Sequence, residues 1–158
     1  MQGSKTKILP FYRDANKLLK GIRTKDYEEL YAAAIDEGLN CKQQINNLAS
    51  QSKEAYSVFY DNELLCCCGV VEYDKQTQTG IMWLLSTNLA YKAVLSYYKA
   101  AEQFINRFLK LCPGGVFVYI SCDYEESLRS ARHFKFLKVY EEAVDIGGKK
   151  HYIYFRRH

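Results

Sequence analysis

Residues 80–86 read Gly-Ile-Met-Trp-Leu-Leu-Ser and residues 116–120 read Val-Phe-Val-Tyr-Ile, and a helical pattern at 88–111 lies between them. Within that pattern apolar residues recur at steps of three and four, the period of an amphipathic helix. Short apolar runs rich in β-branched and aromatic residues are typical of strands in the middle of a sheet. A strand, a helix and a strand in this order predict a βαβ crossover, whose two strands lie parallel.

The segments before this crossover predict a meander of antiparallel strands. Strand patterns at 56–60, 64–73 and 80–86 are separated by polar turns, and 64–73 is apolar enough to be buried on both faces. Upstream we expect a short strand at 8–11, a helical turn or two at 14–19, and helices at 24–36 and 40–50. Thr24 is the expected N-cap of the first long helix and Gly38 its stop.

After residue 120 the pattern predicts one more helix and two strands. The helix spans 123–134 with Asp123 as N-cap, and strands at 136–144 and 149–156 flank Gly147-Gly148. Glycine tolerates the positive φ of a tight hairpin turn. This order of hairpins and one crossover predicts an α+β fold, and the lack of a linker or repeat predicts a single domain over 1–158.

Composition limits the classes of partner. The 158 residues are 48% hydrophobic and include 14 tyrosines, which suit half-buried surfaces and protein interfaces. A net charge of +4 is too small to predict nucleic-acid binding.

The six cysteines form no CxxC pair, and three consecutive ones at 66–68 alternate across a strand, so we expect buried thiols in a reducing compartment and no metal site. No apolar run approaches the ~20 residues that cross a bilayer, and we expect a cytoplasmic protein.

The order of elements resembles the GNAT acyltransferase fold, in which a splayed fourth and fifth strand and the helix between them hold coenzyme A. The resemblance implies that 80–86, 88–111 and 116–120 form this wedge, with the helix N-terminus facing the pyrophosphate. It makes acetyl-CoA the expected cofactor and gives a predicted set of contacts, which are Leu85, Ser86, Thr87, Asn88, Leu89, Ala90 and Tyr91.

A narrower resemblance covers nearly the whole chain. The segments Ile22-Arg23-Thr24-Lys25-Asp26-Tyr27-Glu28-Glu29, Met82-Trp83-Leu84-Leu85-Ser86-Thr87 and Phe134-Lys135-Phe136 are similar to a small GNAT-like protein of short-tailed bacteriophages, in some phages an internal virion protein. This implies a location in the host cell cytoplasm or the virion, and phage virion or host proteins as partners. It leaves an oligomer open.

The chain departs from the GNAT pattern at the residues that carry chemistry. Active enzymes usually have a Q/R-x-x-G-x-G/A turn before the long helix, whereas Ser86-Thr87-Asn88-Leu89-Ala90-Tyr91 contains no glycine. Side chains there would crowd the phosphates. Lys135 replaces the usual glycine before Phe136.

Acetyl transfer to an amine needs a base and an acid. The fourth strand offers no carboxylate, so Glu72 on the neighbouring strand is the nearest candidate base, and Tyr124 at the start of the last helix is the candidate acid. A solvated carboxylate and a packed tyrosine are the plainer interpretations. Asp26, Glu28 and Glu29 are expected to be solvated charges of a surface helix.

Three hypotheses follow. The first is a phage-encoded GNAT-like protein with a degenerate acetyl-CoA site and a non-catalytic role in the virion, in assembly or in host binding. The second is an active N-acetyltransferase that uses Tyr124 as its acid, and the third is a plain interaction module. An open cleft between the fourth and fifth strands favours the enzyme, and a cleft filled by side chains favours the non-catalytic protein.

Overall fold

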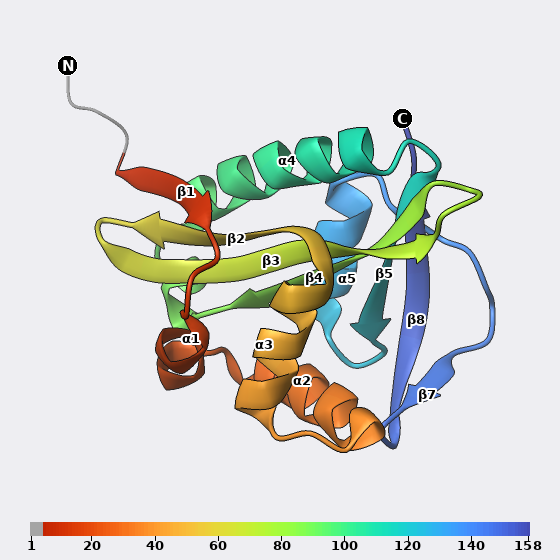
Figure 1. Ribbon diagram of the computed structural model, residues 1–158, viewed down its shortest axis with the longest axis horizontal. Helices are drawn as coiled ribbons and strands as arrows, with labels where there is room; N and C mark the ends of the chain where they lie inside the picture. The colour runs from red at the N-terminus through yellow and green to blue at the C-terminus, as the bar shows by residue number, and fades with distance from the viewer. Residues whose placement is uncertain (1–4) are drawn as a thin grey trace.

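The computed structural model describes residues 5–158, which build one mixed sheet with helices on both of its faces (Figure 1). The sheet order is β1-β2-β3-β4-β5-β8-β6, and β7 also pairs with β8. Every pairing is antiparallel except that of β4 with β5, which is parallel. The predicted α+β class and crossover are therefore confirmed. The strands are β1 (Thr6–Pro10), β2 (Ser52–Tyr60), β3 (Glu63–Asp74), β4 (Thr79–Ser86), β5 (Gly115–Ser121), β6 (Leu137–Lys138), β7 (Val144–Ile146) and β8 (Lys149–Arg156).

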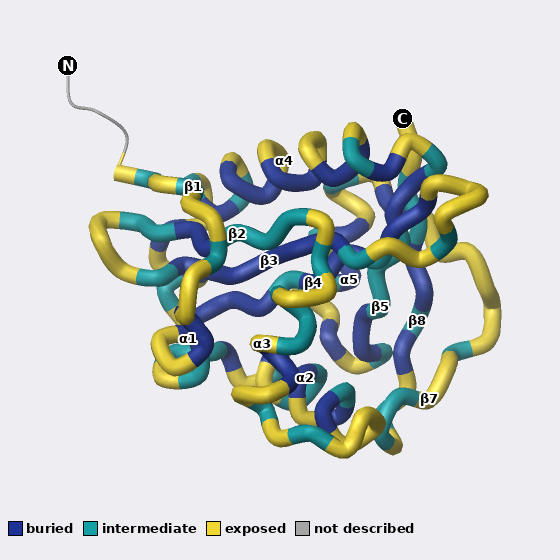
Figure 2. The backbone as a smooth tube through the Cα atoms, in the orientation of Figure 1, coloured by how far each residue is buried: buried dark blue, intermediate teal, exposed yellow. Residues whose placement is uncertain are grey.

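Helices cover the sheet in two groups, and strand alternation decides which residues meet each group. Cys66, Cys68 and Met82 pack into the core under α4 and α5, whereas Cys67 and Trp83 pack under α1, α2 and α3. Figure 2 shows β3 buried along most of its length between these layers. The helices are α1 (Ala15–Gly21), α2 (Thr24–Glu37), α3 (Cys41–Gln51), the 3-10 turn η1 (Asn88–Tyr91), α4 (Val94–Leu111) and α5 (Glu125–His133).

The helix predicted at 88–111 is interrupted. After β4 the chain forms η1, and α4 begins only at Val94, because Ala93 leaves the helical region with φ −108° and ψ 49°. Ala90 and Ala93 are both buried in the same core. The chain has to turn from the end of β4 onto the face of the sheet. The interruption of the helix at Ala93 makes this turn possible while the small side chains of Ala90 and Ala93 both pack into the core.

The predicted caps of α2 and α5 were wrong. Arg23 holds the N-cap position of α2 in extended conformation because its N–H donates to Ser86 O at 2.9 Å, and Thr24 is the first helical residue. Helix α5 begins at Glu125, because the Asp123 carboxylate accepts from Ser121 Oγ and from Lys25 Nζ. The predicted stop at Gly38 is confirmed by its left-handed φ of 70°.

The strand predicted at 136–144 was also wrong in its middle. Of residues 136–146, only those of β6 and β7 pair with β8, and the segment between them, which includes exposed Glu141 and Glu142, leaves the sheet. The segment does not pair with β8 because the adjacent carboxylates of Glu141 and Glu142 stay hydrated when they lie outside the sheet. The turn at Gly147-Gly148 is confirmed, with φ values of 58° and 85°.

Candidate functional site

The two strands of the crossover form a wedge. β4 and β5 pair only where residues 79–81 lie beside 115–117, at the end where both strands begin. Toward Ser86 and Ser121, where the strands end, no β4–β5 pairs continue. Buried backbone N–H groups released by this divergence need other acceptors.

Helix α2 supplies those acceptors from two carboxylates. Asp26 Oδ2 accepts the Ser86 N–H at 2.5 Å, and Glu29 Oε2 accepts the Ser121 N–H at 2.6 Å. Asp26 and Glu29 are three residues apart, so they project from one face of the helix. One turn of α2 therefore links the end of β4 to the end of β5.

Asp26 is also the centre of a buried cluster. Its side chain is 2% exposed and takes a hydrogen bond from Tyr124 Oη at 2.5 Å and another from Arg23 Nη2 at 3.2 Å. The Arg23 guanidinium lies over the rings of Tyr91, Tyr97 and Tyr124, with its Cζ 5.5, 5.7 and 5.5 Å from their centres. We call Arg23, Asp26, Glu29, Ser86, Ser121 and Tyr124 the wedge network.

Burial sets the protonation of this network. Burial raises the pKa of Asp26, and the Arg23 charge and the hydrogen bonds from Tyr124 and Ser86 oppose that rise. Burial raises the pKa of Glu29 to about 8 despite its bond from the Ser121 N–H. Burial and the neighbouring Asp26 charge raise the pKa of Tyr124, so its phenol keeps its proton and donates a hydrogen bond to Asp26.

The structure places the two predicted catalytic residues far apart. Tyr124 lies in the wedge network. Glu72 pairs with Gly80 in the β3–β4 register, near the closed end of the wedge, and its carboxylate is 3.8 Å from Lys53 Nζ on the exposed surface. Gly80 and Ser86 are six residues apart along β4, a rise of roughly 20 Å. Glu72 and Tyr124 are not brought together.

The predicted cofactor segment 85–91 divides between several surroundings. Ser86 lies in the wedge network, and Tyr91 is half exposed against Arg23. Thr87 Oγ1 donates to Leu64 O at 2.8 Å. Leu85 and Ala90 are buried in the two cores. Thr87, Asn88 and Leu89 line a cavity of about 460 Å³ that also borders α1 and the β2–β3 turn, whose lining includes Lys17, Lys20, Gly21, Phe59, Asn62, Glu63 and Leu64.

Asp26 and Glu29 were expected to be solvated, and that expectation was wrong. Asp26 is buried and Glu29 is half-buried, whereas Glu28 beside them is 41% exposed and pairs with Lys25 and Lys149. One signal in the sequence points to the difference. Asp26 is one turn before Leu30, a core residue, so both occupy the buried face of α2.

Side chains of α2 and the first turn of α4 lie at the open end of the wedge. Asp26 and Glu29 already accept the N–H groups at the ends of β4 and β5, and the Asp26 charge is paired with Arg23. At the start of α4, Val94 and Leu95 are 45% and 77% exposed, and no acidic or basic residue lies in that first turn before Lys99.

Among residues 5–158, no group of three or more His, Cys, Asp or Glu side chains is arranged to hold a metal ion. Within the same residues no helix has both the length and the apolar character needed to span a bilayer.

The sequence matches no protein-family model and no curated protein. The structure, however, is similar to an acetyltransferase of the GNAT family from Bacillus anthracis, at 13% identity and a TM-score of 0.66, over 99% of this chain and 97% of that one. It is similar to a ribosomal-protein-S5-alanine acetyltransferase from Vibrio fischeri, at 11% identity and a TM-score of 0.66, over 99% and 95%. It is also similar to a spermidine N-acetyltransferase from Vibrio cholerae solved with CoA and spermine, at 10% identity and a TM-score of 0.64, over 97% and 94%.

The TM-scores establish the fold, and at identities this low nothing beyond the fold follows. The chain has the mixed α+β fold of the GNAT acetyltransferases, as the resemblance implied. The three similar structures are acetyltransferases, and none of them is a phage or virion protein.

Proposed function

We propose that this chain is a GNAT-fold protein that does not transfer acetyl groups and that acts by binding another protein. One observation carries the proposal: α2 occupies the open end of the wedge, with Asp26 on the Ser86 N–H and Glu29 on the Ser121 N–H. These are the strand ends between which the resemblance expects the cofactor. A degenerate acetyl-CoA site follows, because binding would have to break both bonds and the Arg23–Asp26 pair.

The chemistry of the cluster supports the same proposal. A general acid has to release its proton near neutral pH, yet the Tyr124 phenol has a raised pKa and already donates to Asp26. Glu72 lies outside the wedge. If the cofactor does bind, residues 85–91 remain its predicted contacts and Tyr124 remains the predicted acid.

We further propose that the binding role is that of a phage protein, acting in the virion, in assembly or on a host protein. The similarity of 22–29 and 82–87 to the phage family supports this. The exposed aromatic side chains are the kind that protein interfaces use; they include Tyr12, Tyr31, Tyr73 and Tyr140, exposed by 72, 52, 58 and 58%.

Thermal melting with 1 mM acetyl-CoA tests the closed wedge. A ligand present at a hundred times its Kd stabilises the folded state by ~2.7 kcal/mol, which is a rise in Tm of roughly 5–10 °C for a domain of this size. We expect no rise and no release of CoA in the presence of a panel of primary amines. A clear rise accompanied by turnover contradicts the proposal, and a rise without turnover keeps the non-catalytic role but refutes the degenerate site.

The variant Asp26→Ser/Glu29→Ser distinguishes a cofactor site that only these two side chains close from a site that has lost the ability to bind the cofactor. If only the two carboxylates prevent binding, this double variant gains a cofactor-dependent rise in Tm that the natural chain lacks. The matched control is Glu28→Ser, which removes an exposed carboxylate from the same helix.

A further inference from the structure

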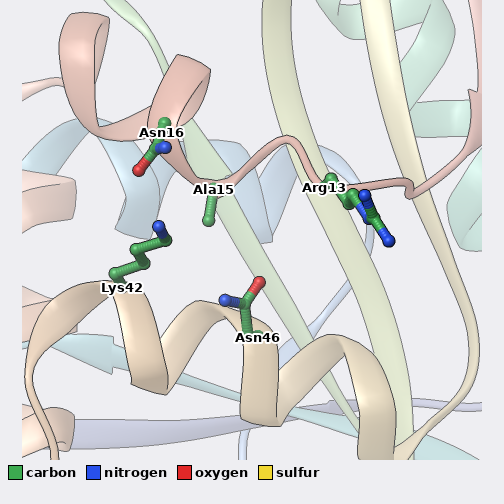
Figure 3. A pocket seen from close by; sticks show the side chains of 5 residues that line it. All are labelled: Arg13, Ala15, Asn16, Lys42 and Asn46. Atoms are coloured by element: carbon green, nitrogen blue, oxygen red, sulfur yellow. The ribbon is translucent and has the colours of Figure 1, made fainter.

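A second hollow lies between α1 and α3, apart from the wedge. It has a volume of about 250 Å³ and is lined by Arg13, Ala15, Asn16, Lys42 and Asn46 (Figure 3). Lys42 and Asn46 are four residues apart on α3 and so share one face. In Figure 3 the Lys42 amino group points toward Asn16 on α1.

The lining of this hollow is rich in hydrogen-bond donors and positive in charge. Arg13 and Lys42 bring two cations, Asn16 and Asn46 bring two amides, and no carboxylate is among the lining residues. Helices α1 and α3 together contain three lysines and neither Asp nor Glu. The walls therefore offer nothing that neutralises these two cations.

The acidic residue nearest in sequence is turned away from the hollow. Asp14 is buried, and its carboxylate accepts from Ser57 Oγ at 2.7 Å and from the Tyr12 N–H at 3.2 Å. Arg13, between Tyr12 and Asp14, has a left-handed φ of 53°. The turn that directs the Asp14 carboxylate inward thus leaves Arg13 at the edge of the hollow, and in Figure 3 its guanidinium points away from Lys42 and Asn46.

The donors of the hollow are unused. Within residues 5–158 the side chains of Asn16, Lys42 and Asn46 have no hydrogen-bond or ion-pair partner, and the Arg13 guanidinium contacts only the Tyr12 ring, 5.3 Å from its centre. Other amides of the same region have structural roles: Asn47 donates to Glu37 Oε2 at 3.1 Å. These four polar side chains are exposed, so water is their partner in the free protein and a ligand can replace that water without breaking a contact of the fold.

We propose that this hollow binds the phosphate group of a small phosphorylated molecule. Arginine offers a planar fork to two oxygens and lysine a compact charge, and a phosphate monoester carries close to two negative charges at pH 7. Lys42, Asn16 and Asn46 face one side of the hollow, and the exposed Arg13 side chain can bring a second positive charge to a bound dianion by rotating. A carboxylate ligand carries one negative charge and would need only one of the two cations. The proposal does not depend on the function proposed for the wedge.

The test is a titration with sodium phosphate and with glycerol phosphate at constant ionic strength, followed by the backbone amide NMR shifts of residues 13–16 and 42–46. We expect saturable shifts confined to these residues. Arg13→Met and Lys42→Met each remove a charge but keep an unbranched side chain, and each should weaken the Kd by tenfold or more. Asn46→Asp places a carboxylate in the hollow and should abolish binding.

The matched control is Lys20→Met, which removes the same charge from α1 at a position outside the hollow, and should change the Kd less than twofold. Equal weakening by Lys20→Met and Lys42→Met would indicate general attraction to a basic surface and would overturn the proposal. Acetate binding as tightly as phosphate, or no saturable shift up to 50 mM phosphate, would also overturn it. A single-stranded DNA oligonucleotide that binds far more tightly than glycerol phosphate would replace the small ligand with a nucleic acid. Circular dichroism and melting of each variant confirm that it is folded.

Discussion

Replacing Asp26 with alanine probes the wedge network most directly. The carboxylate is 2% exposed and accepts from three groups, the Ser86 N–H, the Tyr124 hydroxyl and the Arg23 guanidinium. Asp26→Ala leaves all three without their acceptor, and leaves the Arg23 charge buried without its partner.

The expected loss can be worked from these contacts. Removing one partner of a buried ion pair costs about 3–5 kcal/mol, and each neutral donor left unsatisfied costs about 1–3 kcal/mol. Water entering the vacated space offsets part of this sum, so we expect a net loss of about 4–6 kcal/mol, a large share of the ~5–15 kcal/mol of a typical domain. The corresponding fall in Tm is roughly 10–20 °C.

Urea denaturation at pH 7, followed by circular dichroism and extrapolated linearly to water, measures this loss. Glu28→Ala on the same helix is the control, because its exposed ion pairs should contribute under ~1 kcal/mol. The double variant Arg23→Met/Asp26→Leu replaces the ion pair with apolar groups and should recover much of the stability that Asp26→Ala loses. A loss under ~1 kcal/mol in Asp26→Ala would refute the reasoning, since the network would then not hold the strand ends.

Three further predictions concern other parts of the structure. Because the pKa of Glu29 is raised to about 8 in the folded chain, from ~4.3 when unfolded, the folded state holds this proton more tightly. Stability therefore falls as pH rises from ~4.5 to 8, and Glu29→Gln should melt a few degrees above the natural chain at pH 9 and level with it at pH 4. Gly147→Ala would place a Cβ 1.9 Å from a backbone oxygen of α2, whereas Gly148→Ala meets nothing within 4 Å, so urea denaturation should show a clearly larger loss for the first. Of the six thiols, only the half-buried Cys41 and Cys122 should react quickly with a disulfide reagent in the folded chain, and the four buried ones only after unfolding.

The sheet was predictable because its signals are local. The alternation of Cys66, Cys67 and Cys68 and the apolar run at 80–86 are properties of single strands, and the Gly147-Gly148 turn is a property of two residues. The parallel pairing of β4 with β5 followed from the helix between them.

The wedge network was not predictable in the same way, because its contacts join distant parts of the chain. Asp26 is 60 residues from Ser86 and 98 from Tyr124. A carboxylate in the first turn of a helix usually interacts with solvent and the helix dipole, and only the tertiary arrangement turns this one inward. The phosphate hollow is similar: Arg13 and Lys42 are ordinary surface cations until α1 packs beside α3.

The two borders of the sheet have a consequence for how copies of this chain can associate. On one side β1 is five residues long and ends at Pro10, which has no N–H to donate. On the other side β8 is met by two short strands, and the segment between them carries two exposed glutamates. A foreign strand would therefore find no long, regular row of free peptide groups at either border. Within residues 5–158, these borders therefore disfavour the growth of one sheet into the next through many copies of the chain.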